Sequence, residues 1–167
     1  MENSEEVNSN PKRPTFLLVL CILSFISTGF NLIGNIVNLL KGPLSQDELN
    51  VVLQEMQQLS DMVNQSGSGF TELFEKLAKI TQFTNDNFYM HEFILIASFA
   101  LGFYGVLKMY QGIKNGFHLY IIYNLLSISS IYVSVPPSDV PSFIVIFSVI
   151  FSGIFIFMYS RNLHWMK

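Results

Sequence analysis

Four long apolar stretches constrain the fold of this chain more than any other feature. They span about residues 15–40, 88–107, 117–135 and 142–159. The first holds about 26 residues without a charge, and about 20 apolar residues in a helix cross the hydrocarbon core of a bilayer. The sequence therefore predicts an all-α fold, a four-transmembrane-helix bundle whose chief partner is the lipid bilayer.

The composition agrees with a membrane protein. Apolar residues make up 50% of the chain and charged residues 13%, which is about half the charged share of a soluble domain. The charges cluster outside the apolar stretches, where they avoid a cost of about 2.5–3.5 kcal/mol each at the bilayer centre. The net charge of −3 gives no reason to expect nucleic-acid binding.

One domain preceded by a short tail is predicted. Residues 1–12 are polar, acidic and without periodicity, and we expect a disordered cytoplasmic tail. Residues 13–167 form a single membrane domain. Its first apolar stretch is longer than the roughly 7–15 residues of a signal-peptide core, so we expect an uncleaved signal anchor. The single cysteine, Cys21, excludes an intrachain disulfide.

A helical hairpin is predicted over about residues 45–84, between the first and second spans. Lys41, Gly42 and Pro43 end the first helix, and the Ser45–Glu48 pattern is typical of a capping box. Apolar residues then recur every three or four positions. This hairpin seam consists of Leu49, Val52, Met56, Leu59, Val63, Phe70, Leu73, Leu77 and Ile80. Its two halves either pack on each other or receive a partner.

The segment 84–87 before the second span has two interpretations. Its Thr-Asn-Asp-Asn sequence is typical of a helix break. Alternatively, the second hairpin arm continues into the membrane as one long helix. The absence of proline and glycine from residues 70–101 favours the continuous helix.

Lysine and arginine counts predict the orientation, because cytoplasmic loops carry the excess of these residues. With the N-terminus inside, six lie inside and three outside: Lys12, Arg13, Lys108, Lys114, Arg161 and Lys167 against Lys41, Lys76 and Lys79. Both termini are therefore expected in the cytoplasm and the hairpin outside it. Tyr159 and Trp165 fit an aromatic belt on the inner side.

Two of the spans carry polar stripes. Asn31, Asn35 and Asn38 share one face of the first span with Cys21, Ser24 and Thr28, and Tyr120, Tyr123 and Ser127 share a face of the third, with Asn124 beside it. Amides are costly in lipid, so these faces should meet protein or water. Hydrogen bonding between helices is the favoured interpretation, and a polar pathway is the alternative.

The adjacent residues His91 and Glu92 form an ionisable pair near the outer boundary of the second span. An ionisable group in a span is a candidate functional residue, although this depth also suits a structural role at the interface. No further histidine or carboxylate stands at a ligand spacing. Since no catalytic or phosphate-binding motif occurs either, we expect no catalytic residue, no metal and no cofactor.

Three segments carry a resemblance to known proteins. They are RPTFL at residues 13–17, GFHLY at 116–120 and YSR at 159–161. With them the chain resembles a group of small, uncharacterised four-span bacterial inner-membrane proteins, from about residue 13 to residue 167. The resemblance implies a bacterial inner (plasma) membrane and no particular activity.

The sequence favours a non-enzymatic accessory or scaffold subunit of a membrane protein assembly. The hairpin would present an apolar seam and an acidic face to a protein partner or to a second copy of the chain. The alternative is a subunit of a small channel or transporter, with a polar pathway between the first and third helices. A membrane enzyme ranks third, because the spans lack paired acids, bases or nucleophiles.

Overall fold

The computed structural model describes residues 13–65 and 70–167, and within them it contains helices and no strand. The helices are α1 (Thr15–Lys41), α2 (Gln46–Gln65), α3 (Thr71–Asp86), α4 (Phe88–Tyr110), α5 (Asn115–Ser129), α6 (Ile131–Ser134) and α7 (Ser142–Ser160), with 3-10 turns η1 (Pro137–Asp139) and η2 (Leu163–Trp165). The expected N-terminal tail and the 66–69 part of the expected hairpin tip lie outside the described residues.

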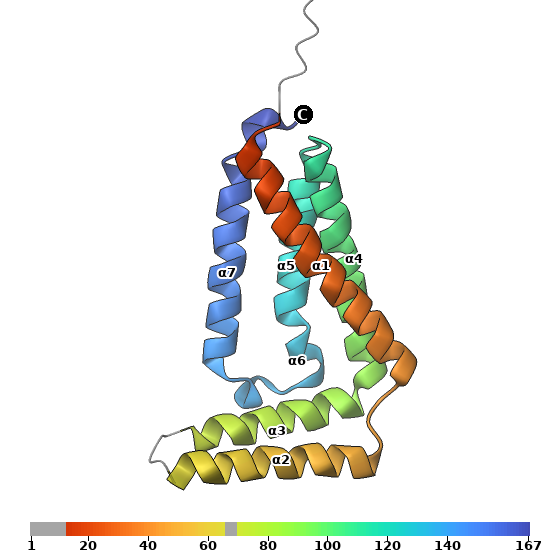
Figure 1. Cartoon of the computed structure of the whole chain (residues 1–167), viewed down its shortest axis with the longest axis vertical. Coiled ribbons are helices and arrows are strands. Elements are labelled where there is room, and N and C mark those ends of the chain that lie inside the picture. The colour runs from red at the N-terminus through yellow and green to blue at the C-terminus, as the bar shows by residue number, and fades with distance from the viewer. Residues whose placement is uncertain (1–12, 66–69) are drawn as a thin grey trace, which may run out of the picture.

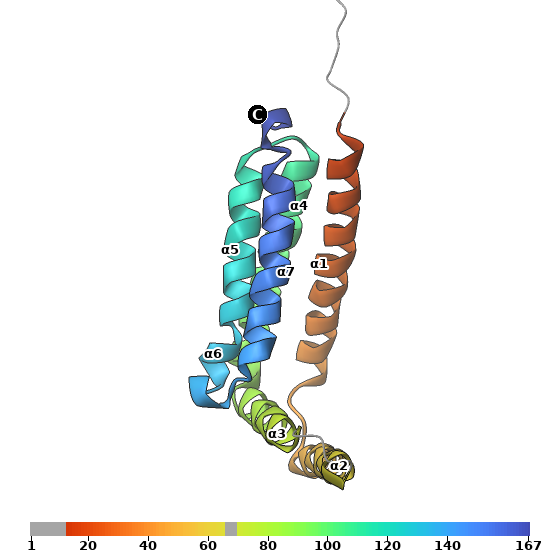
Figure 2. The same cartoon turned by 90° about the vertical axis from the view of Figure 1, so that its left-hand side faces the viewer.

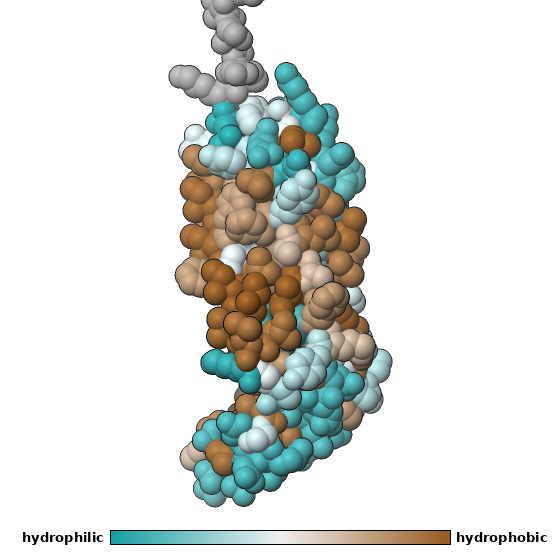
Figure 3. All heavy atoms as spheres, turned by 90° about the vertical axis from the view of Figure 1, so that its right-hand side faces the viewer, coloured by the Kyte–Doolittle hydropathy of each residue, from teal (hydrophilic) through white to brown (hydrophobic). Residues whose placement is uncertain are grey.

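Four helices are long and apolar enough to cross a membrane, as the sequence predicts. They are Thr15–Lys41, Phe88–Tyr110, Asn115–Ser134 and Ser142–Trp165. Figures 1 and 2 show α1, α4, α5 and α7 running along the long axis, while α2 and α3 lie side by side across one end. An apolar band covers the spans between two polar ends (Figure 3). This arrangement is compatible with a multi-pass membrane protein.

Glycines allow α4 and α5 to approach closely along one face. A methyl group added at Gly105 would lie 3.0 Å from the backbone oxygen of Gly116, and one at Gly116 would lie 2.5 Å from that of Gly105. At Gly102 it would lie 2.6 Å from the ring of Tyr123. Close backbone approach through small residues is the usual way that helices pack in lipid. The pair α4 and α5 therefore forms the tightest part of the bundle.

The third span, predicted at about residues 117–135, covers Asn115–Ser134 and is interrupted once, where α5 ends at Ser129 and the short α6 begins at Ile131. Around the break the hydroxyls of Ser129 and Ser130 donate to the carbonyls of Leu126 and Ser127, at 3.2 and 2.7 Å. Serine hydroxyls that bond nearby carbonyls compete with the helical backbone pattern and bend helices. The run of serines therefore gives a reason for the interruption.

The beginning and the end of the described chain meet at the α4–α5 connection. The guanidinium of Arg13 lies 3.7 Å from the ring centroid of Tyr110, and Trp165 packs over Gly112, whose φ is +81°. The backbone of Lys167 donates to Gly112 at 2.7 Å and accepts from Lys114 at 2.9 Å. These contacts hold α1, α7 and the α4–α5 pair together at this end.

The continuous helix favoured for residues 70–101 is wrong. α3 ends at Asp86, Asn87 has φ −110° and ψ 27°, and α4 starts at Phe88 in a different direction (Figure 1). The side chain of Asn87 donates to the carbonyl of Phe83 at 3.0 Å. An asparagine that bonds its own backbone offers an alternative to helix continuation, which explains a break without proline or glycine.

The hairpin seam is only partly buried in the structure. α2 and α3 run antiparallel beside each other (Figure 1), and Leu49 is buried at one end of α2. Leu59 and Phe70, however, are exposed, and Ser60 is buried in place of Leu59. At this point of α2 the buried position thus falls one residue after the predicted Leu59. The other six residues of the hairpin seam are half-buried: Val52, Met56, Val63, Leu73, Leu77 and Ile80.

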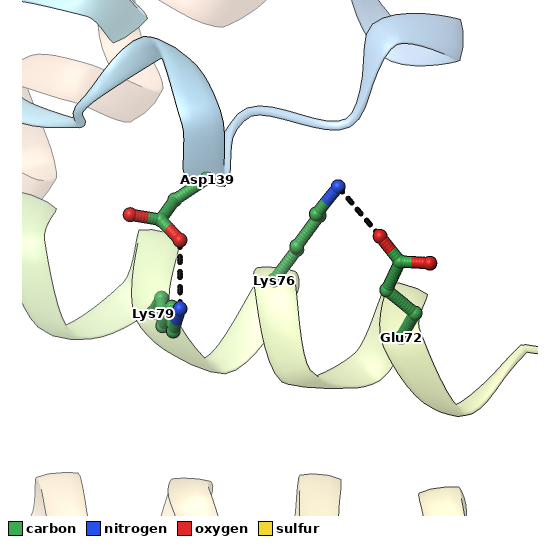
Figure 4. Close-up of polar contacts among 4 residues, drawn as sticks. All are labelled: Glu72, Lys76, Lys79 and Asp139. Carbon is green, nitrogen blue, oxygen red and sulfur yellow. Dashed lines mark hydrogen bonds and ion pairs between the residues drawn. The ribbon is translucent and has the colours of Figure 1, made fainter.

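An ion pair fastens α3 to the turn before α7. Lys79 Nζ lies 2.7 Å from Asp139 Oδ1 (Figure 4). On the same helix Lys76 pairs with Glu72 at 2.9 Å. The first pair joins two segments 60 residues apart, whereas the second stays within one helix turn. Of the two, Lys79 and Asp139 therefore link the α2–α3 pair to the spans.

Replacing Gly116 by alanine should destabilise the bundle, because the added methyl group meets the backbone of α4. We expect a loss of about 1–3 kcal/mol in the free energy of unfolding, measured by reversible unfolding in mixed detergent micelles. The matched control is Gly153→Ala, which has nothing within 4 Å of the added methyl group. It should be neutral or stabilise by up to about 1 kcal/mol. Equal effects of both substitutions would contradict the close approach of α4 and α5.

The Asp139 carboxylate, by its hydrogen bond and its charge, holds the pKa of Lys79 above its ordinary value. The pair should therefore stabilise the fold below the unfolded lysine pKa of about 10.4, and this contribution should disappear as the pH rises through the raised pKa. We expect Asp139→Asn to lower the Lys79 pKa, measured by NMR titration of the lysine side chain. Glu72→Gln serves as the control and should leave the Lys79 titration unchanged. An unchanged titration in Asp139→Asn would count against the pair.

Candidate functional site

A pocket with both polar and apolar lining residues lies where α1, α2, α3 and α4 meet. We call it the junction pocket. Its volume is about 590 Å³, and it is lined by Asn38, Lys41, Gly42, Pro43, Leu44, Glu48, Thr81, Thr84, Asn85, Phe88, His91 and Glu92. Ligand pockets in proteins generally measure about 300–1,000 Å³. The junction pocket is thus large enough to hold a small molecule.

The connection from α1 to α2 forms one wall of the junction pocket. α1 ends at Gly42, whose φ of +83° is readily adopted only by glycine. The predicted capping box is present, since Glu48 Oε2 accepts from the backbone N–H of Ser45 at 2.9 Å and from its hydroxyl at 2.8 Å. These hydrogen bonds hold the pKa of Glu48 below its ordinary value. Its carboxylate therefore fixes the first turn of α2.

Asn85 ties this connection to the end of α3. Its side-chain oxygen accepts from the backbone N–H of Leu44 at 2.8 Å, and its amide donates to the Leu44 carbonyl at 3.1 Å. One side chain thus satisfies both backbone groups of a residue 41 positions away. This role of Asn85 was not predicted from the sequence, although the Asn-rich segment 84–87 indicated that something other than a regular helix occurs here.

Glu92 and His91 both line the junction pocket, but they face different neighbours. Glu92 is 7% exposed; it interacts with the side chain of Asn38, and its Oε2 atom has no hydrogen-bond partner. His91 Nδ1 lies 3.4 Å from the Ser134 hydroxyl on α6. Consecutive residues on a helix point about 100° apart, so the predicted pair does not act as one unit.

A shallow groove on α1 continues from the junction pocket along the helix. It measures about 270 Å³ and is lined by Phe30, Asn31, Gly34, Asn35 and Asn38. Asn38 thus belongs to both hollows. The amide of Asn31 donates to the Ser27 carbonyl at 2.8 Å, and that of Asn35 to the Asn31 carbonyl at 2.6 Å. These amides satisfy their own helix rather than a neighbouring one.

The described chain covers only part of the polar stripe of α1. Asn35 is buried with Cys21, Ser24 and Thr28, whereas Asn31 and Asn38 are exposed. Figure 1 shows the reason: α1 crosses the bundle obliquely and moves away from α7 toward its Lys41 end. A straight stripe on a tilted helix stays over the bundle only where the helices cross.

The polar residues of the third span lie against α1 and α7. Ser24, Thr28, Tyr120, Tyr123 and Asn124 line a cavity of about 180 Å³ together with Leu23, Ser27, Phe151, Ser152 and Phe155. The amide of Asn124 donates to the carbonyl of Tyr120 in its own helix at 2.7 Å. Ser127 is half-buried and lies outside this lining.

A hydroxyl cluster joins three spans beside this cavity. Tyr159 donates to the Ser24 hydroxyl at 3.0 Å, and the Tyr120 hydroxyl lies 3.5 Å from the same oxygen. Tyr159 is completely buried, so its expected place in an interfacial aromatic belt is wrong. Its position at the end of the last span suggested the belt, but α1 and α5 cover it here.

The search for a metal site covers the described side chains. Within residues 13–65 and 70–167, no three His, Cys, Asp or Glu residues are placed to hold a metal ion. Comparison with protein-family models, with curated proteins and with solved structures gave no match. The junction pocket and the α1 groove are thus the features on which a functional argument can rest.

Replacing Asn85 by alanine should loosen the α1–α2 connection, because both backbone groups of Leu44 lose their partner. We expect faster amide hydrogen exchange at Leu44, measured by mass spectrometry of the protein in detergent. The matched control is Asn87→Ala, which removes a side chain that bonds its own helix at Phe83. Equal rates of amide hydrogen exchange at Leu44 in both variants would show that Asn85 does not hold the α1–α2 connection in place.

Proposed function

We propose that this protein is a non-enzymatic accessory or scaffold subunit of a membrane protein assembly in the bacterial inner membrane. The groove on α1 would receive a transmembrane helix of a protein partner or of a second copy. The observation that carries the proposal is the exposure of Asn31 and Asn38 beside Gly34 on a helix that is apolar enough to cross a membrane.

The depth of Asn31 supports a partner at this groove. Asn31 lies ten residues before the end of α1 at Lys41, which is about 15 Å along the helix. An exposed amide at that depth is costly in hydrocarbon, even when one of its N–H groups bonds the helix backbone. A partner helix would satisfy the remaining amide groups and replace lipid with close packing.

Gly34 supports helix packing at the same place. A methyl group added there meets nothing within 4 Å, so a neighbouring backbone has room to approach. Small residues next to asparagine amides are typical of helix interfaces in membranes. Helix α7 offers further surface, since Tyr159 is the one buried residue in Ser142–Ser160.

We propose the orientation with both termini in the cytoplasm and the α2–α3 pair outside. The lysine and arginine distribution supports it, with six of these residues on the cytoplasmic side and three on the other. In this orientation the junction pocket lies at the outer surface of the membrane. The acidic residues of α2 and the exposed face of α3 would then meet a periplasmic partner.

The second candidate is a subunit of a small channel or transporter. The cavity of about 180 Å³ among α1, α5 and α7, with its hydroxyl and amide lining, favours it. Tyr159 donates to the hydroxyl of Ser24, which lines this cavity, and the Tyr120 hydroxyl lies 3.5 Å from the same oxygen. A continuous pathway would therefore require further subunits or a rearrangement of these tyrosines.

Enlarging Gly34 should disrupt the assembly, because a bulky side chain fills the groove. We expect Gly34→Leu to shift the protein, extracted in mild detergent, from a larger complex to its own mass of 19.0 kDa, measured by light scattering with chromatography. The matched control is Gly153→Leu on α7, where the same change also meets open space. A wild-type protein that runs as a 19.0 kDa monomer under these conditions would contradict the proposal.

Crosslinking in membranes checks the same interface without detergent. In a Cys21→Ala background, Asn31→Cys provides a single thiol in the groove. We expect it to crosslink with a partner when intact membranes are treated with a short bifunctional maleimide, and Phe93→Cys on exposed α4 surface serves as the control. Absence of a product specific to position 31 would argue that this groove faces lipid.

A further inference from the structure

We propose that the junction pocket binds a primary ammonium group, with the Glu92 carboxylate as its counter-charge. The unpartnered Glu92 Oε2 atom, on a side chain only 7% exposed, carries this inference. A buried carboxylate oxygen without a hydrogen bond is costly. It indicates a donor that belongs to the site. The inference stands apart from the docking groove and does not depend on it.

The pocket walls supply acceptors that suit such a donor. The hydroxyls of Thr81 and Thr84 donate to the carbonyls of Leu77 and Ile80, at 3.0 and 2.7 Å. Their lone pairs therefore remain available as acceptors. An ammonium group has three donors and no acceptor, which matches a pocket lined by a carboxylate and by hydroxyl oxygens.

Two donors of the pocket wall are engaged elsewhere, and the Lys41 ammonium forms no ion pair with Glu92. The amide of Asn85 donates to the Leu44 carbonyl, and His91 Nδ1 is directed to Ser134. In the described part of the chain, the ion pairs of lysine or arginine with a carboxylate involve Glu72 and Asp139 and leave Glu92 without one. The side chain of Asn38 is the one donor seen at the Glu92 carboxyl. A ligand cation would thus pair with the Glu92 carboxylate without displacing a residue that already binds it.

The position of the pocket suggests two sources for the ammonium group. Glu92 is the fifth residue of α4 (Phe88–Tyr110), so it lies about one helix turn from the membrane surface, at the depth of lipid headgroups. Lys41 also lines the pocket and would pair with the phosphate of an aminoethyl phosphate headgroup. A soluble primary amine offers the same ammonium group without the phosphate.

A ligand cation would reach the Oε2 atom of Glu92 after a rotation of the carboxyl group. The Oε2 atom is buried, but the terminal torsion of a glutamate side chain has a broad energy profile. A turn of the carboxyl group brings either oxygen toward the hollow that Glu92 lines. The pocket itself needs no opening of the helices for a headgroup-sized ligand.

The test compares lipids that differ only in their nitrogen substituents. The full chain is incubated in detergent with phosphatidylethanolamine or with phosphatidylcholine of the same acyl chains, and bound lipid is measured by native mass spectrometry. We expect tighter binding of phosphatidylethanolamine, because its ammonium donates hydrogen bonds and the trimethylammonium does not. In a second arm, ethanolamine is titrated calorimetrically in phosphatidylcholine-only nanodiscs to detect a soluble amine.

Glu92→Gln keeps the size of the side chain and removes its charge. We expect it to weaken ammonium binding roughly tenfold or more, as for the loss of a charge-assisted hydrogen bond. Glu55→Gln, on the exposed face of α2, is the matched control and should leave binding unchanged. Thermal unfolding of each variant verifies that the fold is retained.

The outcomes separate the sources and decide the proposal. Preference for phosphatidylethanolamine that is lost in Glu92→Gln assigns the site to a lipid headgroup. Ethanolamine binding that depends on Glu92, without lipid preference, assigns it to a soluble amine and equally supports an ammonium site. Equal binding of both lipids by the wild type together with no ethanolamine binding overturns the proposal, as does binding that Glu92→Gln leaves unchanged.

Discussion

The close approach of α4 and α5 is the contact on which the rest of this structure depends. Gly105 and Gly116 bring two backbones together with no side chain between them. Because lipid provides no hydrophobic driving force between helices, such close packing is the main source of association. α1 then packs on α4, and the C-terminal residues close over the α4–α5 connection through Gly112 and Trp165. Of the two proposed sites, the junction pocket takes its Glu92 and His91 from α4, and the groove lies on α1.

The second general feature is that many polar side chains of the spans bond their own helix. Thr28, Ser98, Asn124 and Ser148 each donate to a carbonyl four residues earlier. This local solution removes most of the cost of placing a polar group in hydrocarbon. It also means that a polar stripe in the sequence does not by itself identify a helix interface. The contact between Tyr159 and Ser24, by contrast, joins separate spans.

Some parts of the candidate sites could be anticipated from local sequence. The Ser45–Glu48 capping box was predicted because all its partners lie within one helix turn. The role of Asn85 could not be predicted, since its partner Leu44 is 41 residues away and is bonded through the backbone. Glu92 was singled out as an ionisable residue in a span, but its unpartnered oxygen and the surrounding pocket arise only from the meeting of four helix ends.

The sequence by itself determined that the chain is helical and has four segments able to cross a membrane. Hydrophobic length and the position of charges are local properties, and the bilayer imposes them on each segment separately. Only the tertiary structure decided that α3 and α4 separate at Asn87, that Tyr159 is buried, and that Asn31 faces outward while Asn35 faces inward. These outcomes depend on the tilt and crossing of helices distant in the chain, which no local pattern of residues encodes.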